Sequence, residues 1–401
     1  MGRPKRMTGR SDPAATPLLG SPENGTIALD ADPGWILQIR DNLMAWHRTA
    51  GRQLPWRGVR DPYRVLVSEM MLVQTTVAAV IPYYARFLDR FPSIEALAGA
   101  DEADVLKAWE GLGYYRRARQ LQAAARAVVE RHGGVFPSDP EGVRALPGVG
   151  RYIAGAILSF AFDRPAPIVE ANTQRVLARW LAWPDDLTTT RSQARLWEAA
   201  ARLVPEHGAG DFNQAFMDLG ATVCIPRAPL CLACPVAAMC AARREGLQDR
   251  IPAAKVRKPP KDVAEACALI RRGDEYLLLR RGPGRLWEHF WEFPTVHRAG
   301  ADPAGRSLGA EMDPRPGFER LTGLVLDVGP VATTVRFGVT THKVALEVHR
   351  AAWAGGEAAV PDGFVAAAWV APGRIGEYTL SSATRRVLAW LLAHPGSVAP
   401  D

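Results

Sequence analysis

The segment from Leu146 to Arg179 constrains the fold more than any other part of the chain. It reads LPGVGRYIAGAILSF, then AFDRPAP, then IVEANTQRVLAR, which predicts a glycine turn, an apolar helix beginning near Tyr152, a Pro-containing link and a second helix. Gly148 and Gly150 allow a tight turn with positive φ. Such a turn presents backbone N–H groups at a helix N-terminus, where DNA phosphates bind. Glu170 enters the second helix, so a phosphate site lies near a carboxylate. An ordinary helix-to-helix turn is the alternative.

The chain has 401 residues and a formal net charge of +7, which allows two or three domains and suits a polyanionic partner. No apolar run reaches the roughly 20 residues of a membrane span, and the N-terminus lacks a signal-peptide core. We therefore expect a cytoplasmic, DNA-associated monomer with no membrane partner. In that compartment the five cysteines favour metal ligation over disulfides.

The hydrophobic period changes from helical to alternating near residue 260. We expect a disordered basic tail (1–32), an all-α domain (33–240), a basic Pro-containing linker (241–261), an α+β domain (262–395) and a short tail (396–401). Helices are predicted over 36–48, 62–91, 101–109 and 116–131, with Asp61 as an N-cap. Strands are predicted over 264–271, 275–281, 291–296, 331–339, 343–354 and 363–370, with helices near 317 and over 382–392.

Three further motifs carry chemistry. In SEMMLVQTTV, Glu69 lies among large apolar residues, so burial would raise its pKa and suit it to general acid catalysis; an exposed Glu is the alternative. In WEGLGYYRRARQL, Tyr114 lies beside Arg116, Arg117 and Arg119, a grouping suited to wedging DNA and clamping phosphates, or else to a core tyrosine beside a solvated basic face.

The third motif is four cysteines in the spacing Cys-x6-Cys-x2-Cys-x5-Cys: Cys224, Cys231, Cys234 and Cys240. Four thiolates suit one metal centre, either zinc or a [4Fe–4S] cluster, and the presence of only one CxxC favours the cluster. Cys267 is expected to be a small buried residue in a strand.

These motifs resemble the helix-hairpin-helix glycosylases of base-excision repair, and among them the adenine DNA glycosylases of the MutY type, from about Trp35 to about Leu392. The matches are LPGVG with a downstream acid, SEMMLVQT against SEVMLQQT, GLGYY and the cysteine spacing. The resemblance implies a helix-hairpin-helix domain with a [4Fe–4S] cluster, followed by a Nudix-like domain. It further implies a monofunctional DNA glycosylase that removes adenine mispaired with 8-oxoguanine or guanine from double-stranded DNA.

The resemblance also assigns residues. Glu69 falls on the catalytic acid, Gln74 on the second Gln of its motif, and Tyr114 on the ring inserted beside the lesion. Tyr152 replaces the lysine of endonuclease III-type relatives; because a phenol cannot form an imine, we expect no strong strand cleavage and a contact between Tyr152 and the flipped nucleotide. Asn172 is expected to orient Glu170 or the attacking water.

Three departures from the family pattern stand out. Glu170-Ala171 replaces Asp-Gly, which lengthens the acid by about 1.5 Å where geometry is held within about 0.5 Å. The hairpin tip that would read oxidised guanine carries Thr340, Thr341 and His342 where the family has Phe-Ser-His, so a structural His342 is an equal alternative. The Glu-rich Nudix box is absent after Phe293, so this domain should bind rather than hydrolyse.

Rival functions remain at this point. One is a glycosylase of the same fold that acts on another mispaired or damaged base, which the altered acid and tip motivate. Another is a lesion-binding protein with weak or no catalysis. An oxidised-nucleotide hydrolase is a third, disfavoured by the missing Nudix box.

Overall fold

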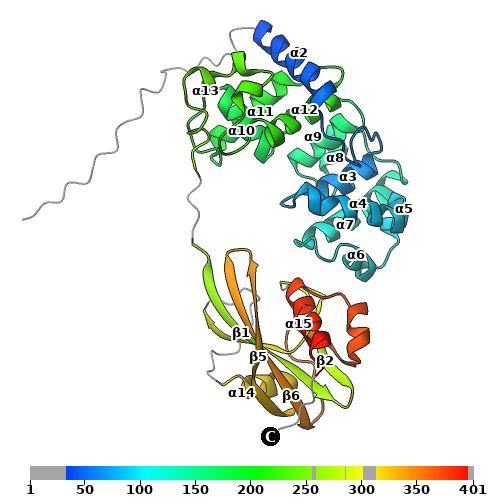
Figure 1. Cartoon of the computed structure of the whole chain (residues 1–401). Coiled ribbons are helices and arrows are strands. Elements are labelled where there is room, and N and C mark those ends of the chain that lie inside the picture. The colour runs from blue at the N-terminus through cyan, green and yellow to red at the C-terminus, as the bar shows by residue number, and fades with distance from the viewer. Residues whose placement is uncertain (1–32, 255–258, 285, 301–312, 396–401) are drawn as a thin grey trace, which may run out of the picture.

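The computed structural model describes residues 33–254, 259–284, 286–300 and 313–395, and the predicted tails at 1–32 and 396–401 lie outside them. Figure 1 shows a helical part followed by a sheet part. Within the described ranges no strand precedes Lys261, so the fold class predicted for each part is confirmed. No helix among the described residues is long and apolar enough to cross a membrane.

The helical part consists of α2 (Pro33–Ala50), α3 (Pro62–Leu72), α4 (Val77–Arg90), α5 (Ile94–Ala98), α6 (Glu102–Ala108), α7 (Arg116–His132), α8 (Pro140–Arg144), α9 (Arg151–Phe160), α10 (Ala171–Trp180), α11 (Thr190–Leu203), α12 (Ala209–Thr222), η1 (Cys231–Ala233), η2 (Ala237–Met239) and α13 (Ala241–Arg244). The segment expected to be a linker therefore begins as the short helix α13.

The prediction of a single helix over 62–91 is wrong, because the structure has two helices, α3 and α4, with a break between them. Asp61 caps α3 as expected, accepting a hydrogen bond from the Tyr63 amide at 2.9 Å. Gln74 then adopts a φ of +57°, which no helix tolerates, and Thr76 caps α4 through the Ala79 amide. The break exposes Gln74 directly after the helix that carries Glu69.

The helices of the site belong to two buried apolar clusters. One joins α3, α4, α7 and α9, and the other joins α2, α10, α11 and α12. Helix α12 contacts both α9 and α10 and so joins these clusters. Two glycines allow close approach of these elements. A Cβ on Gly155 of α9 would lie 2.1 Å from the Pro167 oxygen of the link that follows. A Cβ on Gly220 of α12 would lie 2.7 Å from the Asn172 Cβ of α10.

The sheet part has seven strands in the order β3-β2-β1-β6-β5, with β4 on β1 and β7 on β2. Only β1 and β6 pair in parallel among these, which makes the sheet mixed. Helices α14 and α15 cover its two faces. The elements are β1 (Lys261–Arg272), β2 (Glu275–Arg281), β3 (Trp291–Glu292), β4 (Thr295–Gly300), α14 (Arg315–Thr322), β5 (Val325–Val339), β6 (His342–Gly355), β7 (Phe364–Val370), η3 (Pro372–Glu377) and α15 (Ser382–Ala393).

Two prolines explain where the predicted strands differ. The strand predicted over 291–296 is two strands, because Pro294 lies between them and lacks the N–H that a ladder needs. The strand predicted from 331 instead begins at Val325 and passes through Pro330 where its register to β6 shifts. Cys267 is buried in β1, as expected.

Candidate active site

A cavity of about 480 Å³ opens in the helical part, and both predicted acids line it. Glu69 reaches it from α3 and Glu170 from the start of α10. Two acids that lie 101 positions apart in the sequence therefore share one cleft. The other lining groups include the predicted residues Gln74, Tyr152 and Asn172.

Glu69 is buried, with 2% of its surface exposed, so the alternative of a solvated Glu is excluded. Burial raises the pKa of Glu69 from 4.5 to about 7, against the opposing effects of a hydrogen bond from Tyr152 and the charge of Arg57. Near neutral pH about half of the molecules therefore carry a proton on Glu69. This is the protonation state that a general acid requires.

Tyr152 projects from the first turn of α9 and donates its hydroxyl proton to Glu69 Oε2 at 2.5 Å. Burial and the two neighbouring acids raise the pKa of Tyr152 well above 10, so the phenol stays protonated. The bond occupies Oε2 and leaves Oε1 of Glu69 for another partner. No lysine is found among the described residues that line the cavity.

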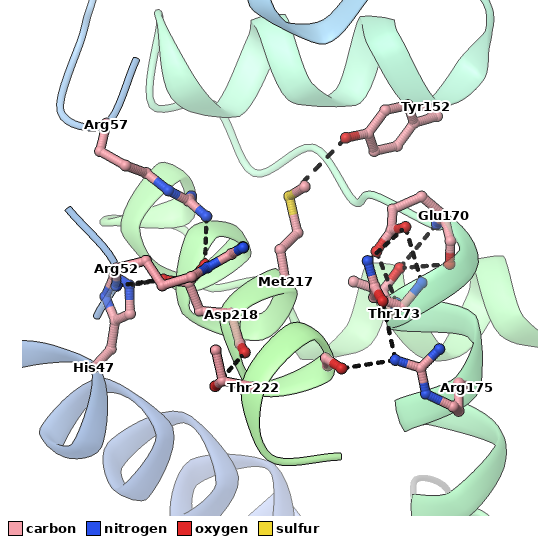
Figure 2. A network of polar contacts seen from close by, with 12 residues as sticks. His47, Arg52, Arg57, Tyr152, Glu170, Thr173, Arg175, Met217, Asp218 and Thr222 are labelled. Atoms are coloured by element: carbon pink, nitrogen blue, oxygen red, sulfur yellow. Dashed lines mark hydrogen bonds and ion pairs between the residues drawn. The ribbon is translucent and has the colours of Figure 1, made fainter. Parts of the chain in front are cut away.

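Glu170 curls back onto the helix that it begins (Figure 2). Oε2 accepts the Asn172 amide at 2.8 Å and Oε1 accepts the Thr173 amide at 3.0 Å, while the Thr173 hydroxyl accepts the Glu170 amide at 2.8 Å. This is a capping box with the acid at the N-cap. The additional methylene of Glu is used in the turn back to its own helix, so the carboxylate lies at the positive end of α10.

Asn172 is fixed in turn by Arg175, which was not predicted. Arg175 Nη2 donates to Asn172 Oδ1 at 2.9 Å and to the Gly220 oxygen at 2.6 Å, and Arg175 Nε donates to the Cys224 oxygen at 2.8 Å. Because Oδ1 accepts from Arg175, the Asn172 Nδ2 group faces Glu170 Oε2, 3.3 Å away. The cavity is thereby connected to the start of the cysteine segment.

A second unpredicted group surrounds Asp218 on α12 (Figure 2). Its carboxylate is fully buried and accepts hydrogen bonds from His47, Arg52 and Arg57. Burial alone would raise the pKa of Asp218, but these cationic and hydrogen-bonding partners lower it to about 2. Arg52 and Arg57 line the cavity, so Asp218 holds two cations at its wall. The only sequence signal was an acid inside the apolar run FNQAFMDLGA.

The hairpin between α8 and α9 uses its two glycines differently. Gly148 adopts a φ of +74°, and a Cβ there would lie 2.6 Å from the Gln120 Cβ. Gly150 is extended, with a φ of −79°, and a Cβ there would meet open space. The expectation of a positive φ is therefore wrong for Gly150. In the described structure no side chain caps the first turn of α9, so its amides are open to an anion.

The tyrosine loop, residues 111–115, presents an exposed Tyr114 with a φ of +48°. Arg116 is exposed beside it, whereas Arg117 is buried and Arg119 binds Glu102 at 2.9 Å. Of the three arginines that the sequence groups with Tyr114, Arg117 and Arg119 are engaged within the protein, and Arg116 is the exposed one.

Thr340 and Thr341 form the turn between β5 and β6, and His342 begins β6, as predicted for a hairpin tip. Both threonines are exposed, and the Thr341 oxygen accepts the Lys261 amide at 2.8 Å. None of the three lines the cavity. The structure therefore brings the predicted acids together and leaves the predicted base-reading tip apart from them.

The four cysteines of the motif line one small cavity of about 20 Å³, together with Arg179. Arg179 Nη1 donates to Cys224 Sγ at 3.2 Å, and none of the five cysteines forms a disulfide. Within the described ranges, no three His, Cys, Asp or Glu side chains are arranged to hold a single metal ion. The segment therefore gathers four thiols around one point without the arrangement of a single-ion site.

Two protein families match separate parts of the chain. Residues 67–202 match the HhH-GPD superfamily base excision DNA repair protein, and residues 266–390 match the NUDIX domain. The first match contains both acids and the hairpin, and the second covers most of the sheet part.

Individual proteins are similar over longer stretches. The adenine DNA glycosylase of Mus musculus is 43% identical over 264 residues, which cover 64% of this chain and 50% of that protein. The adenine DNA glycosylase of Buchnera aphidicola subsp. Acyrthosiphon pisum (strain APS) is 34% identical over 253 residues, which cover 63% of this chain and 72% of that protein. Among solved structures, a thermostable thymine-DNA glycosylase has 31% identity and a TM-score of 0.49 over 53% of this chain and 97% of its own. The chain spans about half the length of the mouse relative.

Proposed function

This chain belongs to the adenine DNA glycosylase family, and from that premise we propose that it hydrolyses the N-glycosidic bond of adenine mispaired with 8-oxoguanine or guanine in cellular double-stranded DNA. One observation carries the proposal. Glu69, buried and with a pKa of about 7, shares a single cavity with Glu170 and Tyr152.

Glu69 acts as the general acid. Inside a duplex the N-glycosidic bond is out of reach of a buried side chain, so the target nucleotide rotates out into the cavity. Glu69 then protonates a ring nitrogen of adenine, which makes the base a better leaving group. Tyr152 occupies Glu69 Oε2, so Oε1 carries the transferred proton. Tyr152 thereby orients the acid and contacts the flipped nucleotide.

Glu170 acts on the sugar. Departure of the base leaves an oxocarbenium-like sugar, whose positive charge a carboxylate stabilises or bonds to briefly before water completes hydrolysis. Burial raises the pKa of Glu170, and the helix amides that bind both its oxygens oppose that rise and hold the carboxylate in place before the substrate arrives. Asn172, held by Arg175, directs its Nδ2 group toward Glu170 and orients the carboxylate or the water.

The enzyme is monofunctional. A strand-cleaving relative needs an amine that forms an imine with the sugar, and the cavity presents the Tyr152 phenol at that place. Water is therefore the final acceptor of the sugar, and the product is an abasic site.

DNA is held by elements around the cavity. The amides of the turn at Gly148 and Gly150 bind a phosphate, and Arg116 binds another. Gln74 and Tyr114, both exposed and both left-handed in backbone conformation, occupy the space that the extruded nucleotide leaves. Thr340, Thr341 and His342 contact the edge of the opposing oxidised guanine.

The four thiols fit a [4Fe–4S] cluster. Cys224, Cys231, Cys234 and Cys240 line one cavity, and the Arg179 guanidinium that donates to Cys224 Sγ suits a thiolate. These four residues would hold the cluster. When bound, the cluster supplies a structural cross-link for the segment 224–240.

A single-turnover assay on a panel of duplexes that differ only in the central pair tests the proposal. The expected result is release of adenine opposite 8-oxoguanine and, more slowly, opposite guanine. Release of another base with no release of adenine would overturn the adenine assignment.

A second candidate is a glycosylase of the same fold that removes a different mispaired or damaged base. The position of Glu170, folded back onto α10 where the family has a shorter acid, is the observation that favours it. The same panel distinguishes the two candidates. A lesion-binding protein without catalysis would release no base from any duplex.

A further inference from the structure

Glu110 connects the helical part to the sheet part immediately before the tyrosine loop. It follows α6 and is 9% exposed. Its carboxylate accepts two hydrogen bonds from the Arg385 guanidinium of α15 and one from the Leu380 amide at 3.0 Å. Lys107 lies 3.2 Å from the same carboxylate and also donates to the Tyr378 oxygen at 2.8 Å. The contact is thus a bidentate ion pair with little water around its acid.

The other end of the tyrosine loop also contacts the sheet part. The Tyr115 ring lies 4.3 Å from the Phe290 ring, centroid to centroid, and Phe290 is 1% exposed within the apolar cluster of the helical part. Arg119, one turn further along α7, donates to the Glu288 oxygen at 2.6 Å. The loop is therefore held at both ends by residues of the sheet part.

Between these ends the backbone is in conformations that need support. Gly111, Gly113 and Tyr114 have φ values of +102°, +70° and +48°. A left-handed backbone is unfavourable for tyrosine and persists only where its surroundings impose it. The supports are the Gly111 amide, which donates to the Tyr115 hydroxyl at 3.1 Å, and the Glu110 oxygen, which accepts from Tyr83 at 2.8 Å.

Arg117 extends these contacts to the helix of the catalytic acid. It donates to the Leu112 and Gly113 oxygens on one side and to the Met70 and Met71 oxygens on the other, the latter two at 2.8 Å. Met70 directly follows Glu69 on α3. A continuous series of contacts therefore runs from the sheet part, through Glu110 and the tyrosine loop, to α3.

We propose that Glu110 is a positioning residue that docks the sheet part on α6 and thereby holds Tyr114 in its exposed, left-handed conformation for entry into the DNA helix. The inference rests on the proposed function, in which Tyr114 inserts beside the target base. Docking of the sheet part then sets how readily the helical part opens the duplex.

Hydrogen exchange of the DNA-free full chain tests the positioning itself. Glu110→Gln keeps the shape of the side chain and removes the charge, and Arg385→Gln removes the same ion pair from the other part. Both variants are expected to raise the exchange rate of the amides in 111–117 about threefold to tenfold. Glu198→Gln, which removes an exposed acid of two ion pairs on α11, is the matched control and should leave these amides unchanged.

Opening of DNA is measured by the fluorescence of 2-aminopurine placed beside the target adenine. Glu110→Gln is expected to slow the fluorescence rise about threefold to tenfold in the parent and to have no further effect in a Tyr114→Ala background. Effects that multiply in the double variant would show that Glu110 does not act through Tyr114 and would overturn the proposal.

Unchanged hydrogen exchange of the amides in 111–117 would also overturn the proposal, whatever the glycosylase activity. A parent chain that opens no duplex would overturn the proposed function instead, and the exchange result alone would then decide whether Glu110 orders the loop.

Discussion

Glu69 shows how two opposed effects fix the protonation of one side chain. Burial disfavours the charged carboxylate, while the Tyr152 hydroxyl and the Arg57 guanidinium favour it. Burial is the largest effect, so the pKa of Glu69 rises to about 7. The two opposing groups keep it from rising further. The Arg57 guanidinium also donates to Asp218, which holds it at the wall of the cavity. The Asp218 group therefore positions one of the two groups that oppose the effect of burial on Glu69.

The raised pKa of Glu69 predicts a change in stability with pH. A folded-state pKa of about 7 against 4.5 means that the folded protein keeps a proton which the unfolded chain has lost. The free energy of unfolding should therefore fall by up to about 3 kcal/mol as pH rises from 4.5 through 7. Glu69→Gln should remove this fall, and Glu198→Gln should retain it. Urea unfolding at pH 5 and pH 8 measures the difference; identical pH dependence in parent and Glu69→Gln would contradict the assigned burial.

Glu170 has a capping role and a proposed chemical role, and two variants separate them. Glu170→Asp keeps the charge with a favoured N-cap residue, and Glu170→Gln keeps the length without the charge. Glu170→Asp should change the free energy of unfolding by less than about 1 kcal/mol. Glu170→Gln should lower it by about 1–2 kcal/mol, because the Gln amide nitrogen cannot accept one of the two helix amides that the carboxylate accepts. Single-turnover rates should fall about 100-fold in Glu170→Gln and less in Glu170→Asp. A Glu170→Gln rate equal to that of the parent would reduce Glu170 to a cap.

At the scale of the elements, the hairpin between α8 and α9 offers a matched pair of glycines. Gly148→Ala should lower the free energy of unfolding by about 1–3 kcal/mol, because it combines a positive φ with a clash on Gln120. Gly150→Ala should change it by less than about 0.5 kcal/mol, since its φ is extended and its Cβ meets open space. Thermal unfolding of both variants measures this. Equal destabilisation would contradict the different conformations of the two positions.

The sequence predicted most elements because their signals are local. Caps such as Asp61 and the alternation after residue 260 give the type and approximate bounds of each element. The break at Gln74 was missed because an apolar helical pattern continues across it. The Asp218 group was missed for a different reason: its partners Arg52 and Arg57 lie 166 and 161 positions away, and no periodicity reports such a contact. The two acids, by contrast, were placed together correctly, by resemblance and not by spacing.

At the scale of the whole molecule, the cysteine segment gives a prediction with an internal control. Cys234→Ser should lose bound iron and acid-labile sulfide, because it removes one of four proposed ligands. Cys267→Ala should keep both, since this residue is buried in β1, away from the cavity of the other four. Iron and sulfide analysis of the purified chains decides the question. Equal iron in the parent and in Cys234→Ser would contradict the ligand set.

The two parts of the molecule divide the proposed work. The helical part contains the cavity with both acids, and the sheet part carries the tip at Thr340–His342 that is proposed to face the opposing base. Their connection through Glu110 and Phe290 could not be predicted, because side-chain fit joins Glu110 to Leu380, 270 positions away, and Tyr115 to Phe290, 175 positions away.

The pH dependence of adenine release under single turnover, on adenine opposite 8-oxoguanine, tests the central role of Glu69 most directly. The parent rate should be constant below a pH of about 7 and fall about tenfold per unit above it, since only protonated Glu69 is active. Glu69→Gln should lower the rate at least about 1000-fold at every pH while preserving the fold. A Glu69→Gln variant that releases adenine at the parent rate would contradict the account.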